Sequence, residues 1–290
     1  MNQDQPHRAP TLFQDARVFT DDYIPDPGPY RMEQAEELAF DLLEGMPSST
    51  LGCIVCRGPA GAGKTTCVRA IFSEIEALSP RFVPIYVDCR VDRTRYSILS
   101  RISLNLTGLP PAEDIGESEV IETIAEHALE HRAMLAICLD DINRISTSAL
   151  NHVLRALLDM HETWPEVRVS VVAVVNSLDL EFYSTPHPFI SSVFHPAEIS
   201  FPSFPGDEIR GILRDRVQQG LSPGVLSDAA FTQVVEQTVA CGNIRMGLSL
   251  LRQAVTIAEQ EGRRSVTRED VRTAYMRWCD GVLQKICGIE

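Results

Sequence analysis

The chain has 290 residues, of which 44% are hydrophobic, so it can bury a substantial core in one large domain or two small ones. Its formal net charge of −14 argues against a protein that coats nucleic acid with its whole surface. No apolar run approaches the roughly 20 residues of a membrane-spanning helix, and residues 1–10 lack the apolar stretch of a signal peptide. We therefore expect a cytoplasmic protein with no membrane partner.

The eight cysteines do not follow the spacing of a disulfide framework or a zinc site. Cys53, Cys56 and Cys138 fall in apolar runs, where a reduced cysteine behaves as a small hydrophobic residue. We expect these three side chains to lie in the core.

Apolar segments alternate with segments of helical periodicity through the first two thirds of the chain. We expect strands at 51–56, 82–88, 133–139 and 167–175, and helices at 31–43, 65–78, 92–106, 118–132 and 146–161. Asp92 is the expected cap of the 92–106 helix. Because the strands are continuously apolar, they are typical of a parallel sheet with both faces covered.

The strands stop near residue 203. Four helices are expected beyond it, at 207–219, 227–239, 243–260 and 267–283. The predicted organisation is an N-terminal segment (1–30), an α/β nucleotide-binding domain (31–204) and a small, all-helical lid domain (205–290).

A phosphate-loop pattern, G-x-x-x-x-G-K-[ST], lies between the first predicted strand and the helix that follows it. Its glycines allow successive backbone N–H groups to turn towards a phosphate, and the helix N-terminus adds partial positive charge. The predicted nucleotide-binding residues of this loop are Gly58, Pro59, Ala60, Gly61, Ala62, Gly63, Lys64, Thr65 and Thr66.

The last two residues of this pattern have different expected roles. Lys64 is expected to meet the β- and γ-phosphates of ATP, and the Thr65 hydroxyl is expected to ligate Mg²⁺. The alternative is a glycine-rich turn without a ligand. The strand before the loop and the helix after it favour the nucleotide.

Polar residues follow two other predicted strands and open one lid helix. Asp140 is the second expected Mg²⁺ ligand, and the predicted catalytic residues are Asp141, Asn176 and Arg245. Asp141 would activate water, Asn176 would orient it, and Arg245 would reach the γ-phosphate. The alternatives are acids that open a loop, a strand-end turn residue and a solvated helix arginine.

These elements and their order resemble the AAA+ ATPases, a class of α/β phosphate-loop NTPases with a parallel sheet and a helical lid. Within that class, residues 13–283 resemble the archaeal replication initiators related to the origin recognition complex and its helicase-loading partner. The supporting segments are 13–25, 86–96, 191–204, 209–216, 223–227 and 242–252. The resemblance implies that Tyr23, Ile24, Pro25 and Arg31 surround the adenine side of the nucleotide.

Two departures from the family pattern predict slow hydrolysis. The acidic motif is Asp140-Asp141 where the family usually has Asp-Glu, which withdraws the second carboxylate by about 1.5 Å, one C–C bond. A misplacement of about 1 Å can cost on the order of a hundredfold in rate. In addition, no Arg or Lys lies between Arg168 and Arg210, where an arginine finger is expected.

A third departure concerns DNA. Members of the resembled family usually continue into a winged-helix domain, whereas the printed sequence ends at Glu290. The remaining candidates for DNA contact are Arg90, Arg93, Arg95 and Arg101, with a solvated helix face as the alternative. We expect any DNA affinity to be weak, non-specific and reduced by salt.

The favoured function is therefore an ATP-binding protein of replication initiation, acting in origin recognition or helicase loading or as a shortened regulator. Its expected partners are origin DNA, other initiator subunits or the replicative helicase. Two alternatives are a regulatory or signalling AAA+ switch that acts on a protein without binding DNA, and a degraded initiator copy that binds only nucleotide and initiator subunits.

Overall fold

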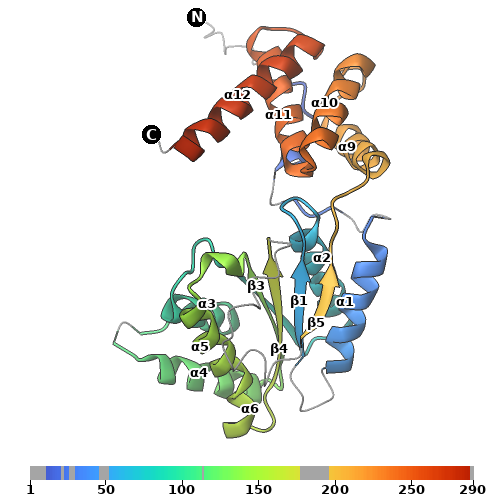
Figure 1. Ribbon diagram of the computed structural model, residues 1–290. Helices are drawn as coiled ribbons and strands as arrows, with labels where there is room; N and C mark the ends of the chain where they lie inside the picture. The colour runs from blue at the N-terminus through green and yellow to red at the C-terminus, as the bar shows by residue number, and fades with distance from the viewer. Residues whose placement is uncertain are drawn as a thin grey trace, which may run out of the picture. The chain divides into compact units, whose positions relative to one another are not determined.

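The computed structural model describes residues 11–20, 23–25, 30–45, 52–112, 114–176 and 196–287. The chain divides into two compact units, and each has its own core (Figure 1). We call Asp26–Pro202 the α/β unit, and Met1–Pro25 together with Ser203–Glu290 the helical unit. Within the described residues, no helix has the length and apolar character needed to cross a bilayer.

The α/β unit contains a five-stranded sheet of order β2-β3-β4-β1-β5, in which every neighbouring pair is parallel. The strands are β1 (Cys53–Arg57), β2 (Phe82–Asp88), β3 (Met134–Asp140), β4 (Arg168–Val175) and β5 (Ala197–Ser200). The predicted parallel sheet and α/β fold class are confirmed.

The fifth strand, β5, is absent from the four that the sequence predicts. It is four residues long, pairs with β1, and buries only Ile199 fully. A strand at the edge of a sheet with one buried side chain has no apolar run for a pattern to detect.

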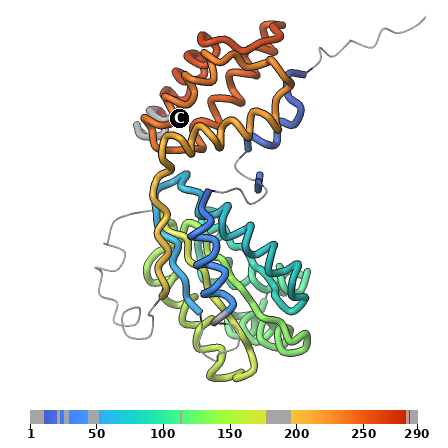
Figure 2. The backbone as a smooth tube through the Cα atoms, turned by 90° about the vertical axis from the view of Figure 1, so that its right-hand side faces the viewer, coloured from blue at the N-terminus to red at the C-terminus, as the bar shows by residue number. Residues whose placement is uncertain are grey.

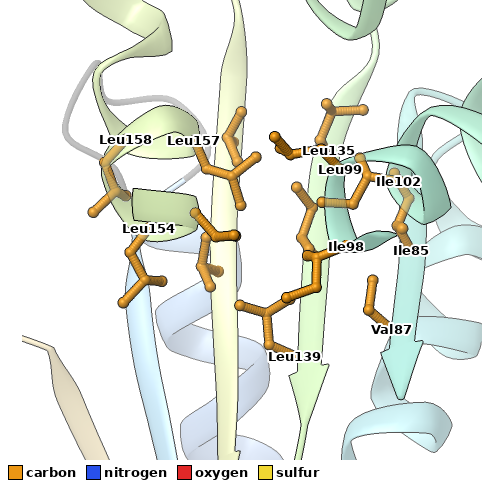
Figure 3. Close-up of a cluster of buried hydrophobic side chains, with 14 of the residues drawn as sticks. Ile85, Val87, Ile98, Leu99, Ile102, Leu135, Leu139, Leu154, Leu157 and Leu158 are labelled. Carbon is orange, nitrogen blue, oxygen red and sulfur yellow. The ribbon is translucent and has the colours of Figure 1, made fainter. Parts of the chain in front are cut away.

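Helices cover both faces of the sheet. The helices among the described residues of this unit are α1 (Met32–Gly45), α2 (Lys64–Leu78), α3 (Arg95–Thr107), α4 (Glu117–Glu130), α5 (Thr147–Leu158) and α6 (Met160–Thr163). α1 and α2 pack on one face, and α3, α4 and α5 on the other (Figure 1). Figure 3 shows Ile98 of α3 and Leu157 of α5 pointing towards the strands, with Leu135 and Leu139 of β3 between them. The apolar faces of the strands are therefore buried on both sides, as their continuous apolar sequence requires.

The α3 helix begins later than the sequence predicts. Its cap is Thr94, whose hydroxyl accepts from the backbone N–H of Ser97, and not Asp92. Asp92 is buried and accepts a hydrogen bond from Arg101 Nε at 2.9 Å. The predicted cap at Asp92 is therefore wrong: both residue types are common caps, but it is the Thr94 side chain that meets the first backbone N–H groups of α3.

The helical unit contains four long helices and a short segment from the N-terminus. The helices are α9 (Gly206–Gly220), α10 (Asp228–Cys241), α11 (Ile244–Gln260) and α12 (Arg268–Cys287), and the N-terminal segment carries the 3-10 helix η1 (Ala16–Phe19). Figure 2 shows this blue segment alongside the orange and red helices. Leu12, Val18 and Phe19 of this segment therefore belong to the core of the helical unit.

Gly220 makes this packing possible. A Cβ at that position would lie 2.4 Å from a ring carbon of Phe19, and the Gly220 carbonyl accepts from the N–H of Gln14 at 2.9 Å. The boundary between the two units lies at Pro202 and Ser203, near the predicted one at residues 204 and 205.

Candidate nucleotide and metal site

The phosphate loop leaves β1 at the carboxyl edge of the sheet and enters α2. Arg57, the last residue of β1, pairs with Val175 of β4 and Ser200 of β5. Gly63 caps α2 with a φ of 90°, a left-handed conformation that favours glycine. The loop therefore lies where ligands bind in open parallel sheets, outside the carboxyl ends of the strands.

Gly58 begins the loop beneath the backbone that follows β5. A Cβ at this position would lie 2.0 Å from the carbonyl oxygen of Phe201, and the Phe201 N–H donates to the Arg57 carbonyl at 2.7 Å. Any side chain at position 58 would force the loop and this backbone apart. The first glycine of the motif is required by close packing as well as by loop conformation.

The Lys64 side chain is buried within the loop and is 3% exposed. Its Nζ donates to the carbonyl oxygens of Gly58 and Pro59, both at 2.8 Å. An ammonium group held in such a poorly solvated position interacts strongly with any anion within its reach. The structure therefore places the predicted phosphate-binding cation inside the loop.

Asp140 lies at the end of β3 with its carboxylate close to the first turn of α2. The Thr65 hydroxyl donates to Asp140 Oδ2 at 3.0 Å, and the Tyr86 hydroxyl donates to the same oxygen. The backbone N–H of Asp141 donates to Oδ1 at 3.0 Å. The structure thus brings together Thr65 and Asp140, the two predicted Mg²⁺ ligands. A carboxylate and a hydroxyl are the oxygen ligands that this hard cation prefers, so the residues present fit the ion.

Tyr86 is a functional candidate that the sequence reasoning missed. Burial, followed by the nearby Cys138 and Asp140, raises the pKa of its phenol, so the group stays protonated and able to donate. Tyr86 pairs with Cys138 in the β2–β3 register, and Asp88 pairs with Asp140. Because side chains alternate along a strand, this register puts Tyr86 and Asp140 on one face. A correct prediction of the register between β2 and β3 would have identified Tyr86 as a neighbour of Asp140.

Asp141 follows Asp140 and adopts a left-handed backbone conformation, with φ 59° and ψ 42°. It is 7% exposed, and its Oδ2 lies 3.5 Å from Arg90 Nε. The pKa of the Arg90 guanidinium is raised, first by its hydrogen bond to Asp88 and then by charges that include Asp141. The predicted water-activating carboxylate therefore lies beside a cation.

Two other predicted residues lie at this edge of the α/β unit. Asn176 follows the last residue of β4, directly after Val175, the partner of Arg57. Arg31 precedes α1, and its guanidinium donates to the Ala62 carbonyl of the phosphate loop at 2.9 Å and to the Pro202 carbonyl. Arg31 therefore braces the loop. Its predicted contact with the adenine side stays a prediction.

The remaining nucleotide candidates, Tyr23, Ile24, Pro25 and Arg245, belong to the helical unit. The Tyr23 hydroxyl donates to Gln219 at 3.1 Å, and the Arg216 guanidinium lies 4.6 Å from the centre of the Tyr23 ring. Arg245 is in the first turn of α11, where its N–H donates to the side chain of the capping residue Asn243. The roles of these four residues at the phosphate loop stay predictions.

The four arginines proposed for DNA contact all have partners within the protein. Arg90 pairs with Asp88 at 2.7 Å, Arg95 with Glu117 at 3.5 Å and Arg101 with Asp92 at 2.9 Å. Arg93 donates to the carbonyl oxygen of Arg90 at 2.8 Å. Three of the four charges are therefore compensated locally, which lowers the positive potential that this segment offers to a phosphate backbone.

Comparison with known proteins agrees with this geometry. A family described as an AAA domain matches residues 48–180, and one described as the Cdc6 AAA+ ATPase-type lid domain matches residues 210–276. Among curated proteins, the ORC1-type DNA replication protein 2 of Methanosarcina mazei is 37% identical over 270 residues, which cover 91% of this chain and 71% of that protein.

Solved structures show the same likeness. The Aeropyrum pernix ORC1 protein, solved in complex with DNA, is 27% identical with a TM-score of 0.78, and the match covers 91% of this chain and 69% of that one. Cdc6p from Pyrobaculum aerophilum has the same fold, with a TM-score of 0.79 at 23% identity and coverage of 92% and 72%.

The sheet, the phosphate loop and the lid define an AAA+ protein. The extent of identity with the M. mazei protein is more specific. This chain belongs to the family of archaeal ORC1-type DNA replication proteins, as the sequence resemblance predicted.

Proposed function

We propose that this protein is a nucleotide-dependent switch in DNA replication initiation, which binds ATP or ADP with Mg²⁺ and hydrolyses ATP slowly. The observation that carries the proposal is the meeting of Thr65 and Asp140 beside the buried Lys64. The roles that we propose for the protein are origin recognition, helicase loading or the regulation of these steps.

The phosphate loop and the residues proposed to act with it have separate roles. The loop N–H groups and Lys64 bind the phosphates, while Thr65 and Asp140 hold the divalent cation, which neutralises phosphate charge when bound. Asn176 orients the attacking water and Asp141 accepts its proton. Arg245 adds positive charge from the helical unit.

Slow turnover follows from the surroundings of Asp141. Its side chain is one methylene shorter than the usual glutamate, and its Oδ2 lies 3.5 Å from Arg90 Nε, so one of the two carboxylate oxygens faces a cation. No Arg or Lys lies between Arg168 and Arg210 to supply a finger to a neighbouring subunit. A protein of this kind converts bound ATP to ADP slowly.

The proposed partners come from the relatives. The A. pernix ORC1 protein is described in complex with DNA, and we propose origin DNA, other initiator subunits or the replicative helicase as partners here. A direct contact from the segment around α3 should be weak because three of its arginines are paired.

The experiment that tests the proposal measures the nucleotide content and steady-state turnover of the purified protein beside an Asp141→Glu variant. We expect bound ADP, turnover below about 1 s⁻¹, the low end of ordinary enzymes, and faster turnover with the longer carboxylate. Brisk turnover in the unaltered protein would show that another residue supplies the missing groups.

The paired arginines favour a second candidate, a regulatory AAA+ switch that acts on a protein partner without binding DNA. Footprinting on origin DNA at low and physiological salt separates the two. Protection of a defined site supports the initiator role, and no protection at either salt concentration supports the regulatory switch.

A further inference from the structure

Tyr86 connects three elements at the candidate metal site. It lies on β2, its hydroxyl donates to Asp140 at the end of β3, and the guanidinium of Arg69 on α2 lies 4.1 Å from its ring centre. The ring is half-buried and packs against the core cluster between the sheet and α2. The phenol is therefore fixed from two sides, with its hydroxyl directed at one carboxylate oxygen.

The hydrogen bonds of Asp140 show what this contact does. Oδ1 accepts from the N–H of Asp141, and Oδ2 accepts from the hydroxyls of Thr65 and Tyr86. An ionised carboxylate offers about four acceptor sites, so these three donors fix the orientation of the group and leave acceptor capacity for a hydrated cation. Thr65 connects the carboxylate to the phosphate-loop helix and Asp141 connects it to the turn after β3. Among the described residues, Tyr86 is the donor that connects it to the neighbouring strand.

We propose that Tyr86 is a positioning residue of the metal site, whose hydroxyl holds the Asp140 carboxylate in the orientation that binds the divalent cation of a nucleoside triphosphate. The inference rests on the proposed function, because it assumes that Thr65 and Asp140 hold this cation. Partners that fix a metal-binding carboxylate contribute on the order of 10- to 100-fold to metal affinity. Arg69 supports the same geometry through the ring.

The test is a Mg²⁺ titration of the binding of a fluorescent ATP analogue, using a Tyr86→Phe variant. This change removes the hydroxyl and keeps the ring under Arg69. We expect the Mg²⁺ concentration that gives half of the gain in analogue affinity to rise about tenfold in the variant. The affinity for the analogue in EDTA should stay within twofold of that of the unaltered protein. Unchanged binding in EDTA also shows that the variant is folded.

The matched control is Tyr96→Phe, which removes a phenol hydroxyl from an exposed position on α3. It should leave the Mg²⁺ dependence within twofold of the unaltered protein. If Tyr86→Phe behaves like this control, or binds Mg²⁺ more tightly than the unaltered protein, the inference is wrong.

A second variant asks whether the hydroxyl acts through Asp140. In an Asp140→Ala background, Tyr86→Phe should change the affinity for the analogue at a fixed, high Mg²⁺ concentration less than twofold, because the effects of residues in one network are not additive. A further tenfold change there would contradict the proposal. If the unaltered protein does not bind the analogue at all, the proposed function itself fails, which is a different outcome.

Discussion

Two buried aspartates, one in each unit, have opposite surroundings. Asp140 at the end of β3 is 5% exposed and Asp270 in the first turn of α12 is 3% exposed. Asp140 accepts from two hydroxyls and one backbone N–H. Asp270 accepts from the Arg263 guanidinium, with Nη1 at 2.7 Å, and from the N–H and hydroxyl of Thr267.

The different donors indicate different roles: the Asp270 carboxylate stabilises the fold, whereas the Asp140 carboxylate is suited to bind a cation. The charge of Asp270 is paired with a cation inside the protein, so its network stabilises the start of α12. The donors around Asp140 orient its carboxylate with dipoles and add no positive charge. A buried carboxylate of the second kind gains most from an incoming cation, which is why we propose Asp140 as the metal ligand.

The largest effect is expected at the phosphate loop from Gly58→Ala. The new Cβ would lie 2.0 Å from the Phe201 carbonyl, so the loop must move away from the backbone after β5. We expect at least about a tenfold loss of ATP affinity, and a fall of roughly 1–3 kcal/mol in the free energy of unfolding from overpacking. Analogue binding and urea denaturation measure the two effects.

Gly281→Ala is the control, since a Cβ at that position on α12 meets nothing within 4 Å. It should preserve nucleotide affinity and keep or raise the free energy of unfolding, by up to about 1 kcal/mol, because alanine favours a helix over glycine. Equal behaviour of the two variants would mean that the contact between the loop and Phe201 does not constrain the site.

A smaller effect, on stability alone, is expected at Asp270. Its hydrogen bond with Arg263 lowers the pKa of this carboxyl from 3.8 to about 2. Since the folded-state pKa lies below the unfolded one, the stabilisation is fully present above about pH 4 and is lost as the pH falls to about 2. The shift corresponds to roughly 2 kcal/mol, which Asp270→Asn should remove at neutral pH.

Thermal and urea unfolding across this pH range check the prediction. Glu269→Gln is the control, because Glu269 lies next to Asp270 and its ion pair with Arg272 is exposed. Nucleotide binding should be the same in both variants. A loss of Mg²⁺ dependence in Asp270→Asn would contradict the distinction between the two aspartates.

The smallest effect is expected from the arginines near α3. Arg101→Ala removes a cation that Asp92 already compensates, so DNA affinity at low salt should change less than about threefold. Arg93→Ala, where the bonded group is a carbonyl, should have the larger effect of the two. A tenfold loss with Arg101→Ala, with a salt slope reduced by about one, would indicate a direct phosphate contact.

The parts of the site that are formed by short, continuous segments could be predicted from the sequence. The phosphate loop, the strand ending in Asp140 and the parallel sheet all follow from short patterns that their neighbours in sequence enforce. The same reasoning correctly placed Cys56 and Cys138 in the core, whereas Cys53, predicted with them, is only half-buried against it.

Contacts between distant segments could not be predicted in this way. The packing of Phe19 on Gly220, the pairing of β5 with β1 and the bond from Tyr86 to Asp140 join residues at least 54 positions apart. Each depends on strand register or on the absence of a side chain, which no local pattern encodes. The error at the start of α3 has a local cause, because Thr94, only two residues after Asp92, is the residue that caps the helix.

The most direct test of the account is calorimetric titration of ATP into nucleotide-free protein, with Mg²⁺ and with EDTA. We predict that Mg²⁺ strengthens binding, that Asp140→Ala removes this gain but keeps the metal-free affinity, and that Asp270→Asn keeps both. Lys64→Ala should weaken binding about 10- to 100-fold in either condition, as expected for a lost hydrogen bond between charged groups. Full Mg²⁺ dependence in Asp140→Ala would contradict the assignment of this carboxylate to the metal.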